Sequence, residues 1–160
     1  MSAVVSDTSP INYLIRVGEI DLLPQIFGEI LIPPAVLQEL RHEGAPLAVQ
    51  EWASRIPLWV RVLAPAGVDQ ALDLGPGEME AIALAKEIGD TLLLIDERKG
   101  RKAAVENGLR TAGTLNILEE AAARGLLDFE QTIARLRATN FRVRNSLLAE
   151  FLARSRARKN

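Results

Sequence analysis

The sequence contains no cysteine and only one histidine, His42. Without cysteine, disulfide scaffolds, zinc ribbons, iron–sulfur centres and thiol nucleophiles are excluded. A single histidine is too few for a histidine-rich metal site, or for a mechanism in which two histidines act as acid and base. Any chemistry must therefore rest on carboxylates, hydroxyls, amides and basic side chains.

Long apolar runs are lacking as well. No stretch approaches the roughly 20 residues that cross a membrane, and the N-terminal segment lacks the basic residues of a signal peptide. We therefore expect a cytoplasmic protein that makes no contact with a membrane. With 160 residues, of which 48% are hydrophobic, the chain can bury a substantial core. We expect a single domain over residues 1–160, with its core in about residues 1–125 and C-terminal helices in about residues 126–160.

Charge is divided unevenly along the chain. The formal net charge is −2, but residues 1–134 carry 20 acidic and 11 basic side chains, whereas residues 135–160 carry one acidic and eight basic side chains. An acidic body with a basic tail indicates a polyanionic partner, a cation held in the body, or both. For the tail alone, solvation of helix faces is an equally good interpretation.

Short apolar runs alternate with segments of helical periodicity. The runs that predict buried strands are Ala3–Ser6, Ile30–Ile32, Trp59–Leu63 and Thr91–Ile95. The segments that predict helices are Pro10–Val17, Ile20–Phe27, Pro34–His42, Ala48–Ile56, Pro76–Ile88, Arg98–Glu106, Thr114–Arg124, Phe129–Arg137 and Ser146–Arg158. This alternation predicts the α/β class with a parallel sheet, and such sheets place their sites at the carboxyl ends of the strands.

Two of the predicted strands end in an aspartate. Asp7 follows the first strand and Asp96 follows the fourth, so both side chains are expected at the same edge of the sheet. Ser9 and Pro10 fit the cap and the first position of the next helix, so Asp7 is not needed as a helix cap. Asp96 directly precedes a predicted helix, and both a capping and a functional role remain open for it.

Two glutamates on predicted helices add to these aspartates. Glu78 falls within the apolar arc of its helix, next to Ile82 and Ala85, where a carboxylate is unfavourable unless something satisfies it. Glu39 lies at the margin of the buried stripe of its own helix. Glu43 is a rival to Glu39, and a plain surface glutamate is an equally good interpretation of Glu39.

Four acids around one sheet edge would need a cation to offset their charge. Because only oxygen ligands are available, Mg²⁺ or Mn²⁺ is favoured over zinc or copper. Carboxylate-bound divalent ions suit hydrolysis of a phosphodiester, with basic side chains binding the nucleic acid. The candidate substrate-binding residues follow Asp96 closely, although a solvated helix face explains them equally well. They are Arg98, Lys99, Arg101 and Lys102.

Five segments together resemble the PIN-domain nucleases, close to VapC-type toxins and to a subgroup described only as nucleic-acid-binding. The segments are Val5–Ser9, Ile32–Leu40, Gly77–Ala85, Leu92–Glu97 and Gly113–Leu115. Their order and spacing are specific as a set, and they span residues 4 to about 125. The resemblance implies a three-layer α/β/α fold around a central parallel sheet of about four or five strands.

The resemblance also implies a function. It implies a metal-dependent endoribonuclease that forms a homodimer and, in toxin operons, an antitoxin that occupies the active-site groove. Thr8 or Ser9 would add a hydroxyl near the Mg²⁺ or Mn²⁺ ion or the scissile phosphate. The acidic pocket that holds the ion would be formed by Asp7, Glu39, Glu78 and Asp96.

This sequence departs from the family pattern at two places. Many relatives carry aspartate at the Glu78 position, and many carry Thr-x-Asp where this chain has Leu94-Ile95-Asp96. The first difference lengthens the ligand, and the second removes a hydroxyl. A catalytically silent module that binds RNA or a protein partner is therefore the alternative to the ribonuclease.

Overall fold

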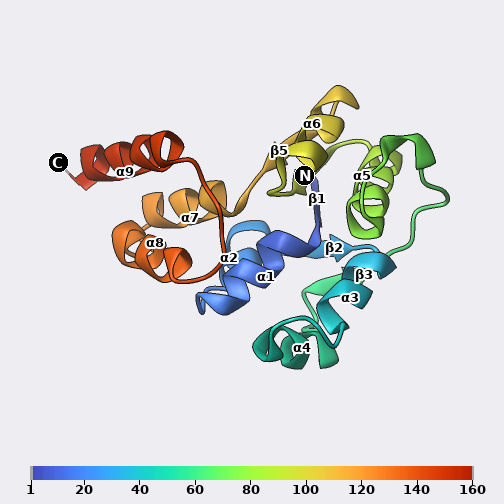
Figure 1. The fold of residues 1–160 in the computed structure, drawn as a ribbon, viewed down its shortest axis with the longest axis horizontal. Helices are drawn as coiled ribbons and strands as arrows, with labels where there is room; N and C mark the ends of the chain where they lie inside the picture. Colours follow the sequence, from blue (N-terminus) through green and yellow to red (C-terminus); the bar gives the residue numbers. More distant parts are fainter. Residues whose placement is uncertain (1, 160) are drawn as a thin grey trace.

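Five parallel strands form one sheet in the computed structural model, which describes residues 2–159 (Figure 1). The strands are β1 (Ala3–Ser6), β2 (Ile30–Ile32), β3 (Val60–Val62), β4 (Thr91–Leu94) and β5 (Arg110–Ala112). Their spatial order is β3-β2-β1-β4-β5, and every neighbouring pair is parallel. The predicted α/β class with a central parallel sheet is confirmed.

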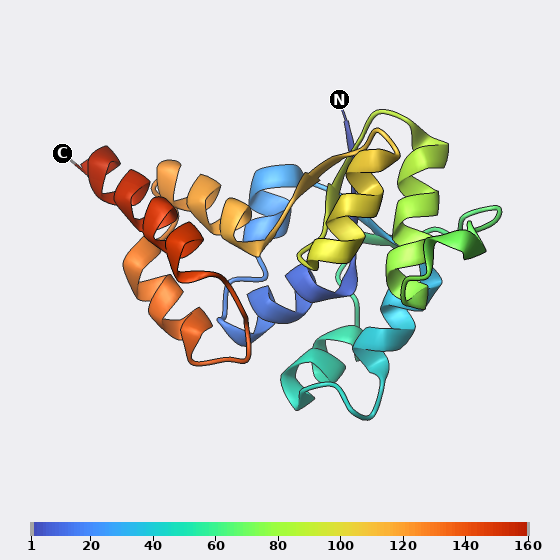
Figure 2. The ribbon, with the colours of Figure 1, turned by 45° about the horizontal axis from the view of Figure 1, so that its top comes forward.

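Helices connect the strands and extend the chain beyond the sheet. They are α1 (Thr8–Arg16), α2 (Leu22–Phe27), α3 (Pro34–Arg41), α4 (Leu47–Ser54), the 3₁₀ turn η1 (Gln70–Leu72), α5 (Pro76–Ile88), α6 (Arg98–Glu106), α7 (Thr114–Ala123), α8 (Phe129–Arg137) and α9 (Asn145–Lys159). In Figures 1 and 2, α7, α8 and α9 form a group at one end of the molecule.

The sheet has a separate apolar cluster on each face, which gives the three-layer α/β/α arrangement that the resemblance implies. Successive residues of a strand point to opposite faces, so Val4 belongs to one cluster and Val5 to the other. The Val4 cluster is larger and includes residues from α1 to α4 and from α7 to α9. The Val5 cluster is smaller and is covered by α5 and α6. Both faces of the central strand are therefore buried.

Three local features differ from what the sequence pattern alone indicates. The helix α1 begins at Thr8, so Asp7 rather than Ser9 occupies the cap position. Pro10 then falls in the first turn, where its missing N–H breaks no hydrogen bond. The helix predicted over Ile20–Phe27 begins only at Leu22, and Pro24 lies in its first turn. The fifth strand, Arg110–Ala112, lacked an apolar run because it is a three-residue edge strand whose first side chain is exposed.

The basic C-terminal helix α9 is tied to the two helices before it by ion pairs. Arg154 and Arg158 both lie beside Glu119 of α7, and Arg156 pairs with Glu130 of α8. Lys159 also pairs with Asp128, and Arg135 of α8 pairs with Glu19, so five of the eight basic side chains in residues 135–160 have acidic partners. Among residues 2–159, no helix is both long and apolar enough to cross a membrane.

Candidate functional site

The two strand-end aspartates meet where the order of the sheet reverses. The chain builds outward from β1 on one side through β2 and β3, and on the other side through β4 and β5. In open parallel sheets, the crevice outside the carboxyl ends of the two strands at this switch point is where ligands bind. Asp7 directly follows β1, and its backbone N–H donates to the carbonyl of Leu94 at the end of β4 (2.8 Å). Asp96 follows Leu94 by two residues.

Asp7 is buried, and one of its two carboxylate oxygens has no hydrogen-bond partner. Only 3% of the residue is exposed, and its Oδ1 accepts no hydrogen bond. Burial, opposed by the Thr8 N–H, raises the pKa of Asp7 from 3.8 to about 8, and the charges of Glu78, Glu39 and Asp96 add to the increase. Although it occupies the cap position of α1, Asp7 makes no capping hydrogen bond with its side chain. The fold therefore holds a carboxylate here that the helix does not use.

Asp96 is held by Thr114, the first residue of α7. The Thr114 backbone N–H donates to Oδ1 (2.7 Å), and the Thr114 hydroxyl donates to Oδ2 (2.6 Å). Burial raises the pKa of Asp96, whereas these two bonds and the positive charge of Arg101 lower it. Asp96 therefore does cap a helix, but it caps α7 and not the helix that follows it. The Thr114 hydroxyl also supplies a donor to Asp96 in a chain that lacks the Thr-x-Asp threonine.

Glu39 reaches the same edge of the sheet from α3, and we call the group Asp7, Glu39, Glu78 and Asp96 the acidic pocket. Its Oε1 accepts a hydrogen bond from the hydroxyl of Thr8 (3.0 Å), so the first residue of α1 orients this carboxylate. Glu39 also contributes to raising the pKa of both Asp7 and Glu78, which places the three carboxylates within electrostatic reach of one another. Ser9 is half-buried, and its hydroxyl makes no hydrogen bond among the described residues.

Glu78 projects from the first turn of α5, as its helical position predicted. Its Oε2 is buried and has no hydrogen-bond partner. Burial raises the pKa of Glu78, the charge of Glu97 adds to this increase, and the Gly75 N–H opposes it. Glu97 is thus a fifth carboxylate at the site. Its position directly after Asp96 was the available sequence signal, but helical periodicity says nothing about a residue between a strand and a helix.

Glu80 has a structural role that the helical wheel missed. On a helical wheel Glu80 falls beside Glu87, on the solvent side of α5, but in the structure it is half-buried. Its Oε1 accepts a hydrogen bond from the backbone N–H of Ala35 in the first turn of α3 (3.0 Å). The carboxylate thereby satisfies one of the free N–H groups at the start of that helix. Contact between α3 and α5, which a one-helix wheel cannot represent, explains the difference.

The carboxylates fit a divalent cation in their chemistry, although they are not arranged as a finished coordination shell. Within residues 2–159, no three His, Asp or Glu side chains are positioned to hold a metal ion as they stand. Buried polar atoms almost always have partners, yet Asp7 Oδ1 and Glu78 Oε2 have none. Mg²⁺ is commonly bound by one or two carboxylates and keeps several waters. Asp7 and Glu78 are therefore the residues that could hold the ion, with Glu39 and Asp96 beside them.

Glycines make room for these carboxylates. A Cβ atom on Gly77 would overlap the Glu39 carboxylate, and one on Gly100 would overlap both Glu78 Oε2 and Ile95 Cδ1. Gly100 lies in α6, where alanine would otherwise be the better helix former. The absence of side chains at these positions is thus a condition for the present placement of the pocket carboxylates.

Gly100→Ala is expected to destabilise the protein in spite of its higher helix propensity. Replacing glycine inside a helix normally gains about 1 kcal/mol, but overpacking against Glu78 and Ile95 costs about 1–3 kcal/mol. Urea unfolding of the metal-free protein measures the difference. Gly67→Ala is the control for the added methyl group, because Gly67 lies outside the helices and a Cβ there meets no atom within 4 Å. A Gly100→Ala variant clearly more stable than the wild type would contradict the close contact.

The four candidate substrate-binding residues of α6 differ in the charged groups that they contact. All four are exposed, but only Arg101 is close enough to Asp96 for its charge to lower the pKa of that aspartate. Lys99 pairs instead with Asp73 (3.4 Å). Arg98 and Lys102 form no ion pair among the described residues. Arg101 is therefore the member of the set that the structure brings to the acidic pocket.

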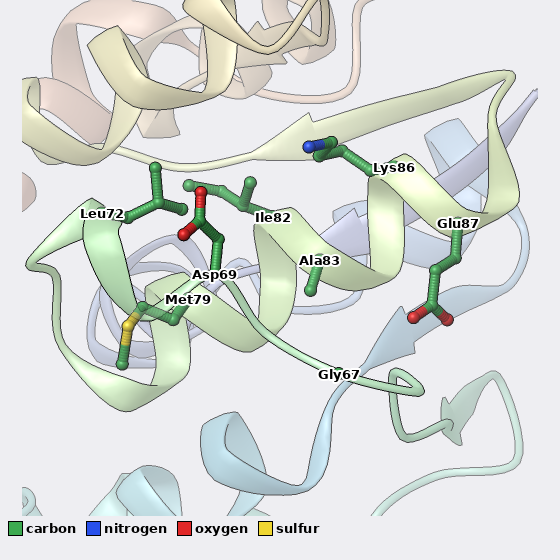
Figure 3. A pocket seen from close by; sticks show the side chains of 8 residues that line it. All are labelled: Gly67, Asp69, Leu72, Met79, Ile82, Ala83, Lys86 and Glu87. Atoms are coloured by element: carbon green, nitrogen blue, oxygen red, sulfur yellow. The ribbon is translucent and has the colours of Figure 1, made fainter.

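A hollow lies beside α5, next to the segment that precedes this helix (Figure 3). Its lining is mostly apolar and includes Leu72, Met79 and Ile82, with Lys86 and Glu87 toward one end. None of the residues predicted for the site lines it. The hollow and the candidate site at the switch point therefore share no residue.

A family model described as a PIN domain matches residues 3–157. The chain is also similar in structure to a PilT N-terminus domain protein from the hyperthermophilic archaeon Sulfolobus solfataricus P2. That similarity has a TM-score of 0.48 and 16% sequence identity, and it covers 90% of this chain and 100% of the other. A comparison with curated proteins finds no match.

Proposed function

The chain belongs to the PIN-domain family, and on this premise we propose that it is a divalent-metal-dependent endoribonuclease that hydrolyses RNA phosphodiesters at the acidic pocket. PIN domains are generally nucleases and typically use divalent metals. The observation that carries the proposal for this chain is the pair of buried, unpartnered oxygens, Asp7 Oδ1 and Glu78 Oε2, among further carboxylates. Burial that raises the pKa of Asp7 to about 8 disfavours the ionised carboxylate, and a bound cation would offset that cost.

The residues around the pocket would have different roles. Asp7 and Glu78 would hold Mg²⁺ or Mn²⁺, which when bound activates water and stabilises the oxygens of the phosphodiester. Thr8 orients Glu39, and Thr114 fixes Asp96 through two hydrogen bonds. These contacts restrict the carboxylates before the substrate arrives. Arg101 brings a positive charge to the same edge, where it would attract the RNA backbone.

The assembly of the protein is also part of this proposal. We propose a homodimer, and a role as the toxin of a toxin–antitoxin pair in which an antitoxin segment occupies the pocket. Both statements rest on membership of the family. A small antitoxin-like reading frame beside the gene would support the toxin role, and its absence would favour a nuclease that acts alone.

The experiment is an RNA-cleavage assay with the purified, partner-free chain. We expect a labelled single-stranded RNA to be cleaved with Mn²⁺ or Mg²⁺ and to stay intact with EDTA. Asp7→Asn should lower the cleavage rate by at least about a hundred-fold, since loss of even an indirect partner of a metal site costs ten- to a hundred-fold. Asp21→Asn is the matched control, because Asp21 is exposed and makes no capping bond. Equal cleavage with Mn²⁺ and with EDTA would contradict the proposal.

A second candidate function is a binding module without catalytic activity. The observation that favours it is the lack of any three side chains in residues 2–159 that are ready to ligate one ion. RNA binding without cleavage, with both ions and at several pH values, would support this candidate over the nuclease.

A further inference from the structure

A polar cluster joins α1 to the segment between α8 and α9. The Tyr13 hydroxyl and Arg16 Nη1 both donate to Oδ1 of Asn140, at 3.2 and 2.6 Å. Phe141 packs edge-on against the Tyr13 ring with 4.9 Å between ring centroids, and Arg142 follows it in the chain. Figures 1 and 2 both show this segment running beside α1. We call Tyr13, Arg16, Asn140 and Arg142 the rim cluster.

The acidic pocket lies at the start of α1, and the rim cluster lies toward the end of that helix. Ser9, Tyr13 and Arg16 are spaced by four and three residues, so they share one face of the helix. The helix starts directly after Asp7, and at 1.5 Å per residue Arg16 lies about 13 Å along its axis. A short stretch of a nucleic-acid strand would therefore reach from the pocket to the rim cluster.

Electrostatics connects the rim cluster to the pocket. Burial raises the pKa of Tyr13, the charges of Arg16 and Arg142 lower it, and the charge of Asp96 raises it. The Tyr13 hydroxyl thus lies within electrostatic reach of one pocket carboxylate and of two arginines. The rim cluster and the pocket are neighbouring regions of opposite charge.

Several cationic and amide donors of the rim cluster have no acidic or hydrogen-bond partner among the described residues. In residues 2–159, neither Arg16 nor Arg142 forms an ion pair, in contrast to the four basic residues of α9 that do. Asn140 is exposed, and its Oδ1 receives both internal bonds while its amide N–H groups donate to no described residue. Two cationic groups and an amide donor are therefore available to a ligand rich in anionic acceptors.

The aromatic ring in the rim cluster is already covered. Arg16 Cζ lies 5.5 Å from the centroid of the Tyr13 ring, and Phe141 packs against the same ring. Stacking of a base on Tyr13 would require these contacts to separate. The available chemistry is thus recognition of a phosphate by arginine and amide donors, which positions a strand without reading its sequence.

We propose that the rim cluster binds a backbone phosphate of the RNA strand, a short distance along the strand from the phosphodiester that lies in the acidic pocket. This inference rests on the proposed function, because it assigns a second contact to the same substrate. The pocket carboxylates repel a polyanion, so cationic contacts outside the pocket are needed to hold the strand. Arg101 on α6 and the rim cluster on α1 would supply such contacts on either side of the pocket.

Asn140→Asp separates a binding role from a structural one. The substitution keeps the Oδ1 acceptor for Tyr13 and adds a charge beside Arg16, so we expect unchanged or higher thermal stability. It also replaces the free amide donor by an anionic oxygen, so we expect RNA affinity to fall by about tenfold. The control is Gln25→Glu, which makes the same chemical change at an exposed position of α2. This helix leads into the amino end of β2, whereas the acidic pocket lies at the carboxyl ends of the strands.

Arg142→Ala tests the same contact without adding a negative charge. Affinity is measured by fluorescence anisotropy of a labelled single-stranded oligoribonucleotide in EDTA, at several salt concentrations. Loss of one phosphate contact to a single strand should reduce the slope of log K against log salt by about 0.7. Arg55→Ala, at the exposed end of α4, removes the same charge near the start of β3 and should change the slope less.

Different experimental outcomes would overturn the nuclease proposal and the rim-contact proposal. Wild-type cleavage with Mn²⁺, combined with RNA affinities of Asn140→Asp and Arg142→Ala no lower than those of their controls, would overturn the rim contact and leave the nuclease standing. Wild-type RNA binding that weakens in both variants, without cleavage under any condition, would support the rim contact and overturn the nuclease. Absence of RNA binding by the wild type would overturn the rim contact directly.

Discussion

Without divalent ions, the protein is expected to become less stable as the pH rises from about 4 to about 8. Asp7 stays protonated in the folded protein up to a pKa of about 8, whereas its ordinary pKa is 3.8. Between these values the unfolded chain binds fewer protons than the folded chain, so raising the pH favours unfolding. The expected slope is roughly 1 kcal/mol per pH unit. The raised pKa values of Glu78 and Asp96 act in the same direction.

Chemical unfolding in EDTA at pH 5, 6, 7 and 8 measures this slope. Asp7→Asn should flatten the profile, because the amide cannot ionise and the burial of a charge is avoided. Asp21→Asn, at an exposed aspartate, should keep the wild-type slope. Stability that rises with pH over this interval in the metal-free wild type would show that Asp7 is already ionised and compensated without a cation.

Binding of Mn²⁺ is expected to release about one proton near neutral pH. Asp7 is mostly protonated below its pKa of about 8, and a carboxylate must lose its proton to bind a metal. The apparent affinity for Mn²⁺ should therefore rise by about tenfold per pH unit from pH 5 toward pH 8. Calorimetric titration in two buffers of different ionisation enthalpy measures the released protons. An affinity that does not change over this interval would mean that no buried carboxyl deprotonates on binding.

Much of the candidate site could be inferred from the sequence, because its residues sit at points that local rules identify. Strand ends locate Asp7 and Asp96, since an apolar run followed by an acid marks the carboxyl edge of a parallel sheet. The 3.6-residue period locates Glu78, because its place on the apolar arc is visible within one helix. The predicted fold class depended on the alternation of short apolar runs with segments of 3.6-residue periodicity, and it is confirmed.

The remaining features depend on contacts between elements that are distant in the sequence. Thr114 meets Asp96 only because β4 and α7 come together across the β4–β5 pair. Glu80 meets Ala35 because α3 and α5 lie side by side. The basic tail could not be interpreted from its spacing of two residues, because its partners lie on two other helices. No local pattern contains these pairings, so they emerged only from the fold.

The central claim is that the acidic pocket holds a divalent cation through Asp7. Its most direct test is the titration of Mn²⁺ into the wild type and into Asp7→Asn at pH 7, side by side in the absence of RNA. Binding to the wild type with release of about one proton, and loss of at least about a hundred-fold in affinity in Asp7→Asn, is the predicted result. Equal affinity of the two proteins for Mn²⁺, or no binding to the wild type, would contradict it.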